Sequence, residues 1–298
     1  MPNLYYKNSE FEERFRNQSL FNFLGVKGTE VSREGEVVHK QLFDHFFKCD
    51  IHKIKIMDFK TFKAYMSAYD NPLNVMFRTA LNKFPFTAKL RNGLEVEIKS
   101  KRHAYFFTTL YDLDIIYVDD RFIQFRYKDT ILKFYFDING FVALGEIFRD
   151  GIYNVDVKER TVVDVGAGIG DSPVYFTLNG ARKVYAFDVK VMYLEKNIME
   201  NNLKDVVEPI RCECGLSNNL DVITLKYNIP YGSVLKVDCE GCEYSFFGVA
   251  PRWISRYHTI VIEYHNGVQH LADLLKGFNV TIKGNKKKIG LIYARRLE

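Results

Sequence analysis

Residues 161–171 read TVVDVGAGIGD, and this stretch decides the fold. The apolar residues of Thr161–Val165 predict a buried strand, and glycines at 166, 168 and 170 follow it directly. Glycine lets the backbone turn sharply and approach a ligand closely, and the helix that begins there presents free N–H groups. In doubly wound α/β sheets, ligands bind in this crevice. The stretch therefore predicts a ligand-binding turn between a strand and a helix.

The spacing of the glycines separates two classes of cofactor. Dinucleotide-binding loops place glycines at relative positions one, three and six, where they seat a pyrophosphate. Here the positions are one, three and five, and Asp171 occupies the sixth. A carboxylate repels a pyrophosphate but suits the cationic methionine part of S-adenosylmethionine (SAM), and Asp164 likewise suits an ammonium group. Asp188 ends the next strand about twenty residues later and can accept both ribose hydroxyls in either class. The sequence favours SAM.

After about residue 160, strands alternate with helices, which predicts a parallel sheet covered on both faces. The expected elements are helices over 171–179, 190–202 and 268–276 and strands over 183–187, 207–212, 234–238 and 259–264. Residues 278–296 read as two strands joined by a tight turn, and a methyltransferase sheet receives one antiparallel strand from such a hairpin. We therefore expect residues 141–298 to form an α/β, Rossmann-like class I methyltransferase domain that binds SAM.

Residues 1–140 have a different pattern and predict an α+β region with a small antiparallel sheet. The expected elements are helices over 9–25 and 58–83, the latter broken at Asn71-Pro72, a hairpin turn at Asn92-Gly93 and three strands over 113–138. The chain contains 25 Phe and 19 Tyr but one Trp, and most of these aromatic residues precede residue 150. Such residues suit sugar stacking, a core or a dimer contact. We expect a substrate or assembly module.

The second half resembles the FkbM family of SAM-dependent methyltransferases over about residues 145–265. The matching stretches are VVDVGAGIGDSPVYFTLNGARKVYAFD (162–188), LEKNIMENNL (194–203), LKVDCEGCEYSFF (235–247) and VIEYH (261–265). The resemblance implies a Rossmann-like fold and methyl transfer to a hydroxyl of a sugar or a natural product. The family often has Glu-Pro where this chain has Asp188-Val189, so the ribose contacts are expected to shift slightly. The short stretch between Leu216 and Val234 leaves little chain to cover a substrate.

Charged residues end the fourth and fifth expected strands, where acceptor chemistry is expected. The enzyme must align the acceptor and remove a proton from an alcohol. We predict Asp238 or Glu240 as the base or acceptor clamp, with His265 as the next candidate. Lys236 shares a strand face with Asp238 and is expected to pair with these carboxylates, keeping one ionised. The alternative is an ion-pair network that only braces the crevice, with His265 merely hydrogen-bonded.

The cofactor site is expected to combine the glycine loop with the ends of the second and third strands. Its predicted residues are Asp164, Gly166, Ala167, Gly168, Gly170, Asp171, Asp188, Val189, Glu213 and Cys214. The pairs Cys212-x-Cys214 and Cys239-x-x-Cys242 could supply four thiolates to zinc. Buried cysteines also behave as small hydrophobic residues, and we predict no metal.

Two other functions remain open. The stretch Asn228–Tyr231 resembles the NIPY element with which adenine-N6 methyltransferases of ribosomal RNA hold an extruded base, although a turn before Gly232 explains the same letters. RNA is therefore the alternative acceptor, and it predicts a basic surface that reaches Tyr231. Lys286–Lys288 could contact phosphates or form a solvated hairpin tip. A non-catalytic SAM-binding module is the third hypothesis, and the retained carboxylates speak against it.

The bulk composition sets the remaining expectations. The 298 residues are 47% hydrophobic and 27% charged with a net charge of +5, which is ordinary for a soluble globular protein and permits an anionic partner without requiring one. Five cysteines and a start without a signal-peptide pattern indicate a reducing, cytoplasmic location. No window reaches the roughly 18 apolar residues of a membrane span. We expect a small hydroxylated acceptor, a carbohydrate or glycoconjugate, and leave a homo-oligomer open.

Overall fold

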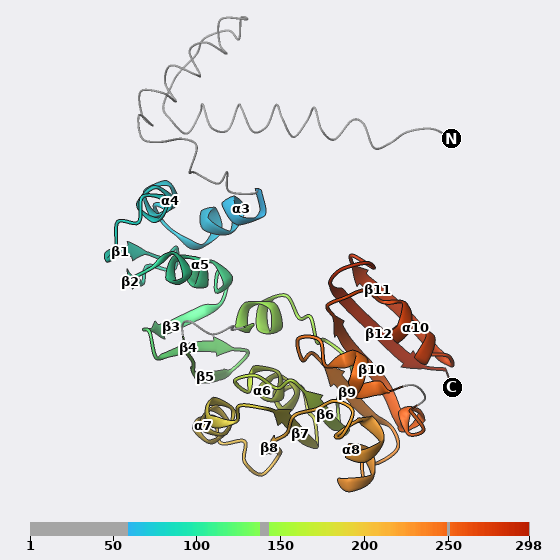
Figure 1. Ribbon diagram of the computed structural model, residues 1–298. Helices are drawn as coiled ribbons and strands as arrows, with labels where there is room; N and C mark the ends of the chain where they lie inside the picture. The colour runs from blue at the N-terminus through green and yellow to red at the C-terminus, as the bar shows by residue number, and fades with distance from the viewer. Residues whose placement is uncertain (1–58, 138–142, 249–250, 298) are drawn as a thin grey trace, which may run out of the picture. The chain divides into compact units, whose positions relative to one another are not determined.

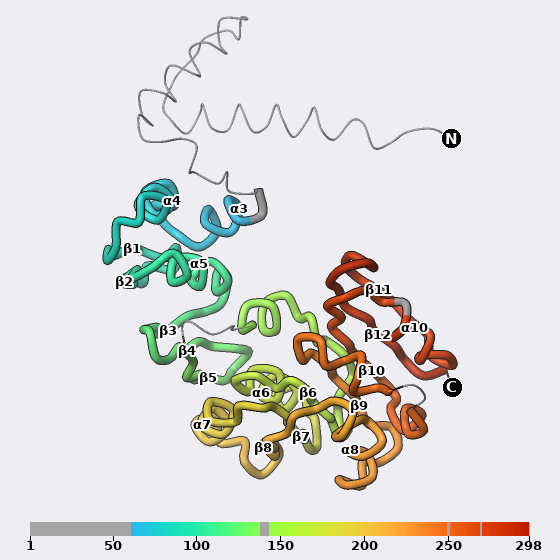
Figure 2. Tube along the Cα trace, in the orientation of Figure 1, coloured from blue at the N-terminus to red at the C-terminus, as the bar shows by residue number. Residues whose placement is uncertain are grey.

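The computed structural model describes residues 59–137, 143–248 and 251–297, all within one unit, Met57–Glu298. The expected helix over 9–25 lies outside these residues. The first described elements are α3 (Phe59–Ala68), α4 (Pro72–Ala80), β1 (Phe86–Lys89), β2 (Glu95–Ile98) and α5 (Lys101–Thr109). Figure 2 follows the chain from α3 in blue to β12 in red. None of the described helices is long and apolar enough to span a membrane.

The predicted break and hairpin of this region are confirmed. Pro72 is the first residue of α4, and the Asn71 side chain accepts a hydrogen bond from the backbone N–H of Asn74 at 3.3 Å. Strands β1 and β2 pair antiparallel across the turn at Asn92-Gly93. Helix α5 was not expected from the sequence. Its start is fixed by Ser100, whose hydroxyl accepts from the N–H of His103, an N-cap typical of helices.

The three strands expected over 113–138 form a separate antiparallel sheet of β3 (Asp114–Val118), β4 (Phe122–Tyr127) and β5 (Thr130–Tyr135). One face of this sheet is apolar, with Phe125 and Phe134 fully buried. Both rings pack against Phe148 of the short π-helix η2 (Gly145–Arg149), with centroid distances of 5.1 and 5.8 Å. Tyr175 of α6 (Asp171–Leu178) contacts the same ring. Much of the aromatic content therefore forms a core.

The main sheet has seven strands, and its topology confirms the expected methyltransferase arrangement. They are β6 (Thr161–Val165), β7 (Lys183–Asp188), β8 (Val207–Arg211), β9 (Ser233–Val237), β10 (Tyr257–Tyr264), β11 (Phe278–Gly284) and β12 (Gly290–Arg296). Their order is β11-β12-β10-β9-β6-β7-β8, as the labels in Figure 1 show. Strands β6 to β10 are parallel neighbours, whereas β12 lies antiparallel between β10 and β11.

Helices cover both faces of this sheet because alternate strand residues point to opposite sides. Val162, Val234 and Val261 pack with α6 and with α7 (Met192–Glu200). The neighbouring strand residues on the other face, such as Val163 and Leu235, pack with a second set of helices. This set comprises α8 (Leu220–Lys226), α9 (Glu243–Phe247) and α10 (Gln269–Leu274), next to the short η3 (Ile254–Arg256). Helices α8 and α9 are short and were not expected.

Helix α7 joins the small sheet to the glycine loop through two asparagines. Asn197 is fully buried. Its side-chain oxygen accepts from the N–H of Tyr135 at 2.7 Å, and its amide donates to the carbonyls of Tyr135 and Ile169, both at 2.8 Å. Asn201 bonds both backbone groups of Lys133 in the same way. The edge of β5 is thus hydrogen-bonded by side chains rather than by another strand.

We predict that Asn197→Ala lowers the free energy of unfolding by about 2–4 kcal/mol, because it leaves partly buried backbone groups of Tyr135 and Ile169 without their hydrogen-bond partner. Urea denaturation of the full chain, followed by circular dichroism, measures this. The control is Glu200→Ala, which removes a partly exposed ion pair to Lys133 and should leave the midpoint nearly unchanged. Equal midpoints for the two variants would contradict the assigned role of Asn197.

Candidate functional site

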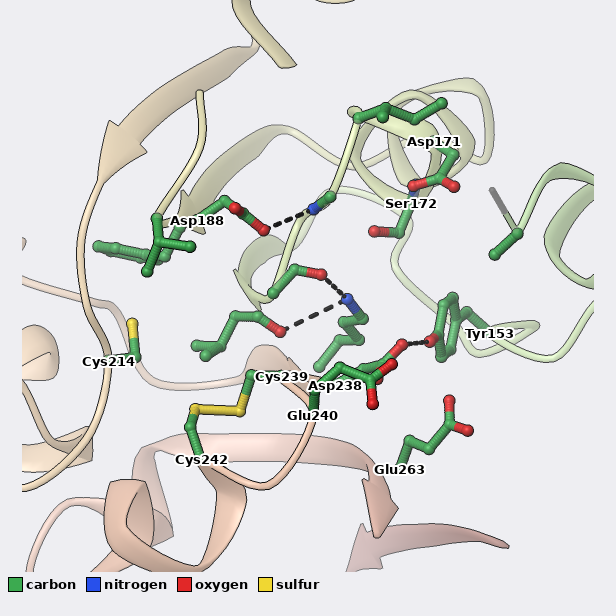
Figure 3. A pocket seen from close by; sticks show the side chains of 18 of the residues that line it. Tyr153, Asp171, Ser172, Asp188, Cys214, Asp238, Cys239, Glu240, Cys242 and Glu263 are labelled. Atoms are coloured by element: carbon green, nitrogen blue, oxygen red, sulfur yellow. Dashed lines mark hydrogen bonds between the residues drawn. A yellow bond between two sulfur atoms is a disulfide. The ribbon is translucent and has the colours of Figure 1, made fainter. Parts of the chain in front are cut away.

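A cavity of about 490 Å³ opens at the carboxyl ends of the central parallel strands, a volume typical of small-molecule sites. Its wall consists of the glycine loop after β6, the ends of β7 and β8, the turn after β9, the end of β10 and the segment around η2. Figure 3 shows this wall from close by. The sheet order brings these segments together, since β6 lies between β7 and β9. The cavity is therefore where a doubly wound sheet binds its ligand.

The glycine loop takes a conformation that requires glycine. Gly166 has a φ of 76°, and a Cβ atom there would collide with the carbonyl oxygen of Asp238. The N–H groups of Gly166 and Ala167 both donate to the carbonyl of Phe187, at 2.9 and 3.0 Å. Gly166 and Gly168 line the cavity, whereas Ala167 and Gly170 are buried beside it. Ala167 and Gly170 therefore contribute to the conformation of the loop and not to the cavity wall.

Asp188 ends β7 at the edge of the cavity, as expected from the sequence. Its Oδ2 accepts from the N–H of Gly168 at 2.9 Å (Figure 3), and its Oδ1 accepts from the N–H of Lys190 at 2.8 Å. The carboxylate is therefore fixed in direction and still faces the cavity. Val189, half-exposed beside it, lines the same wall together with Glu213 and Cys214.

Lys236 of β9 and Asp164 of β6 form a fully buried ion pair. The two residues are direct partners in the register of these strands, and Lys236 Nζ lies 3.0 Å from Asp164 Oδ1. Lys236 Nζ also donates to the carbonyl of Gly166 at 2.5 Å, while the Ser172 hydroxyl donates to Asp164 Oδ2 at 2.7 Å. Burial alone would lower the pKa of Lys236, but the facing carboxylates outweigh it and raise that pKa. The amine thus stays charged.

This pair corrects two expectations. Lys236 pairs with Asp164, not with the carboxylates of Asp238 and Glu240, because the strand register aligns the first two. Asp164 has no exposed surface and does not line the cavity, so its carboxylate is not placed to bind an ammonium group of a ligand. Asp171 does line the cavity, and burial raises its pKa to about 6.

Asp238 and Glu263 form an acidic end of the cavity with Tyr153. The Tyr153 hydroxyl donates to Asp238 Oδ2 at 2.6 Å (Figure 3). Burial, followed by the negative charge of Asp238, raises the pKa of Glu263 to about 7. Glu146 of η2 lines the cavity here as well and adds to the rise. Sequence reasoning missed Tyr153 and Glu146, which precede β6, and passed over Glu263 for its neighbour His265.

His265 and Glu240 lie at the rim rather than among these carboxylates. His265 is absent from the cavity wall. Its Nδ1 lies 3.0 Å from Oε1 of the fully buried Glu243, and its Nε2 lies 3.5 Å from Glu240 Oε2. Glu240 lines the cavity with a side chain that is 77% exposed. The position of His265 therefore fits the alternative that this side chain is hydrogen-bonded and does not act as the base. Glu240 lies at the rim of the cavity.

The two cysteine pairs contribute to the wall of the cavity but not as four thiolates. Cys239 and Cys242 are joined by a disulfide (Figure 3). Cys212 and Cys214 are free, with their sulfurs 3.6 Å apart, and burial raises the pKa of Cys214. Within the described part of the chain, no group of three or more His, Cys, Asp and Glu side chains is arranged to hold a metal ion.

The base-clamp interpretation of Asn228–Tyr231 is wrong. This stretch lies between α8 and β9, at the amino end of β9, whereas the cavity lies at the carboxyl ends of the strands, and none of its residues lines the cavity. Tyr231 is exposed and lies under the guanidinium of Arg256, 4.8 Å from the ring centroid. The position after β9, where such an element would act, is occupied by Asp238 and the disulfide turn. Lys286–Lys288 form the exposed β11–β12 turn.

Comparisons with known proteins show a limited likeness. No protein-family model matches the chain. An uncharacterized protein, 158B, of Sulfolobus islandicus rod-shaped virus 1 is 27% identical over 137 residues, which are 45% of this chain and 79% of the viral protein.

Solved structures resemble about half of the chain. TrmK from M. capricolum, in complex with S-adenosylhomocysteine, is 12% identical with a TM-score of 0.40, covering 50% of this chain and 67% of its own. The ribosomal protein L11 methylase from Lactobacillus delbrueckii subsp. bulgaricus is 18% identical with a TM-score of 0.35, covering 49% and 75%.

The buried ion pair can be tested by removing its amine. We predict that Lys236→Met lowers the free energy of unfolding by about 3–5 kcal/mol, because Asp164 is left charged and unpaired in the core. Adding Asp164→Asn to this variant should recover much of the loss. Burial raises the pKa of Asp164, so the penalty in Lys236→Met should shrink as the pH falls from 8 to 5 and the carboxyl takes up a proton.

Chemical denaturation of the three proteins across this pH range provides the measurement. A Lys236→Met protein as stable as the parent at pH 8, or a double variant weaker than the single one, would contradict the buried pair.

Proposed function

We propose that the chain is a SAM-dependent methyltransferase. The observation that carries this is the Asp188 carboxylate, fixed by the N–H of Gly168 at the edge of a cavity that the glycine loop forms. Asp171 occupies the sixth position of that loop and lines the same cavity, where it would repel a pyrophosphate. A neutral or cationic ligand fits these carboxylates better than a dinucleotide does.

The residues of the cavity can be matched to the ribose, the adenine and the methionine part of SAM. Asp188 would accept the ribose hydroxyls, and the half-exposed Val189 would contact the adenine ring next to Glu213 and Cys214. Gly166 lines the cavity and lets the glycine loop pack against the backbone of Asp238, because a Cβ atom there would collide with the Asp238 carbonyl. Asp171 would face the amino group of the methionine part. We assign the domain that holds these residues to 141–298 and the preceding region to substrate binding or assembly.

The acidic end of the cavity supplies the groups that deprotonate and position the acceptor. When bound, SAM supplies a methyl group on a sulfonium sulfur, which an acceptor lone pair takes while the carbon–sulfur bonding pair stays on sulfur. Glu263, with a pKa of about 7, is suited to take a proton near neutral pH. Tyr153 holds Asp238 in place beside it. Glu240 at the rim is suited to clamp the acceptor.

The acceptor must carry a proton that a carboxylate can remove. A hydroxyl of a sugar or natural product, which the FkbM resemblance implies, meets this condition. RNA is less suitable, because its phosphates would face the carboxylates of the cavity wall.

Isothermal titration of the full chain with SAM, S-adenosylhomocysteine and NAD tests the proposal. We expect the first two to bind and NAD not to bind. Asp188→Ala should weaken both by roughly 10- to 100-fold, since charge-assisted hydrogen bonds to the ribose are lost. The control Asp205→Ala changes an exposed aspartate in the turn before β8 and should bind as the parent does. Binding of NAD alone, or of none of the three, would refute the methyltransferase.

A further inference from the structure

The wall of the cavity is strongly acidic, although the whole chain carries a net charge of +5. Among the described residues that line it, seven are carboxylates: Glu146, Asp171, Asp188, Glu213, Asp238, Glu240 and Glu263. One lining residue is basic, Lys236. The acidity is therefore a local property of this cavity and not of the protein as a whole.

Four of these carboxylates lie away from the glycine loop, where the acceptor would enter. Glu146 comes from η2, Asp238 and Glu240 from the turn after β9, and Glu263 from the end of β10. Figure 3 shows Asp238, Glu240 and Glu263 on the same side of the cavity as Tyr153. Three separate segments thus bring negative charge to one end.

The nearby positive groups are already engaged. Lys236 has a side-chain exposure of 2% and bonds Asp164 and the carbonyl of Gly166. His265 turns its Nδ1 to the buried Glu243 and does not line the cavity. Both groups oppose the rise in the pKa of Glu263, and His265 Nε2 also faces Glu240. These two groups offset only part of the charge of seven carboxylates.

The carboxylates also repel one another. The negative charges of Asp238 and Glu146 both raise the pKa of Glu263, after the larger effect of burial. A cation that enters this end relieves the repulsion, and an anion adds to it. Removing a proton from a hydroxyl requires one base, whereas four carboxylates gather at this end of the cavity.

We propose that the acceptor is an amine that enters this acidic end as an ammonium cation and is methylated on nitrogen. The inference rests on the proposed function, methyl transfer from SAM in this cavity, and replaces the hydroxyl acceptor considered there with an amine. The ammonium gives one proton to the Glu263 carboxylate, which frees the nitrogen lone pair. The nitrogen gains the methyl group and becomes a methylammonium, and the proton on Glu263 leaves to solvent. Charge is balanced, because the sulfonium becomes a neutral thioether as one proton is released.

Sinefungin is a direct probe of this end of the cavity. In this analogue of SAM, a carbon that bears a primary ammonium group replaces the methylated sulfonium, so the charge points to where the acceptor nitrogen would lie. S-adenosylhomocysteine is its neutral counterpart. We expect the full chain to bind sinefungin at least about 10-fold more tightly than S-adenosylhomocysteine at pH 8, since charge-assisted hydrogen bonds contribute that much.

The variants Glu263→Gln and Glu146→Gln locate the effect. Each should reduce the preference for sinefungin several-fold while leaving the affinity for S-adenosylhomocysteine unchanged, which also shows that the variant is folded. The control Glu208→Gln changes a surface glutamate of β8, paired with Lys183 outside the cavity, and should keep the full preference.

Three other outcomes would contradict either the amine acceptor or the proposed function. Equal binding of the two analogues by the parent protein, or a preference that both cavity variants retain, would overturn the amine acceptor and leave the methyltransferase intact. Displacement of sinefungin by a single-stranded RNA oligonucleotide would overturn it in favour of an RNA acceptor. Failure of both analogues to bind would refute the proposed function itself.

Discussion

The ion pair of Lys236 and Asp164 is the interaction on which the rest of the site depends. Two charges in the centre of the sheet are costly to bury, and they are tolerated because each also has a hydrogen-bond partner. One end of this network is the carbonyl of Gly166, so the pair holds the glycine loop of β6 against β9. The other end is Ser172, in the first turn of α6. A single buried ion pair thus joins the glycine loop, the first turn of α6 and the end of β9, two residues before Asp238.

The cavity that results has two chemically different ends. At one end, Asp188 is held by two backbone N–H groups and faces the cavity as a hydrogen-bond acceptor. At the other end, burial and the negative charge of Asp238 raise the pKa of Glu263, and the Tyr153 hydroxyl donates a hydrogen bond to Asp238. The Asp188 carboxylate, a hydrogen-bond acceptor with a fixed direction, suits a neutral ligand that bears hydroxyl groups. The carboxylates of Asp238 and Glu263 suit proton transfer. This division follows from the sheet order, which places the ends of β7 and β10 on opposite sides of β6 and β9.

The fold was largely predictable because its signals are local. Strand and helix periodicity, the glycine loop and the terminal hairpin each lie within a short stretch of sequence. The short helices α8 and α9 gave no such signal. The partner of Lys236 could not be predicted, since it depends on the register of two strands that are distant in sequence. The same limit explains why Tyr153 was missed.

The central claim is that this cavity is a SAM site with Asp188 at the ribose and the carboxylates at the reacting end. A crystal structure of the full chain with S-adenosylhomocysteine tests it most directly. The account predicts ribose hydroxyls within hydrogen-bonding distance of Asp188 and a sulfur atom that faces Asp238 and Glu263. A nucleoside bound outside the cavity, or one with its ribose turned away from Asp188, would contradict the account.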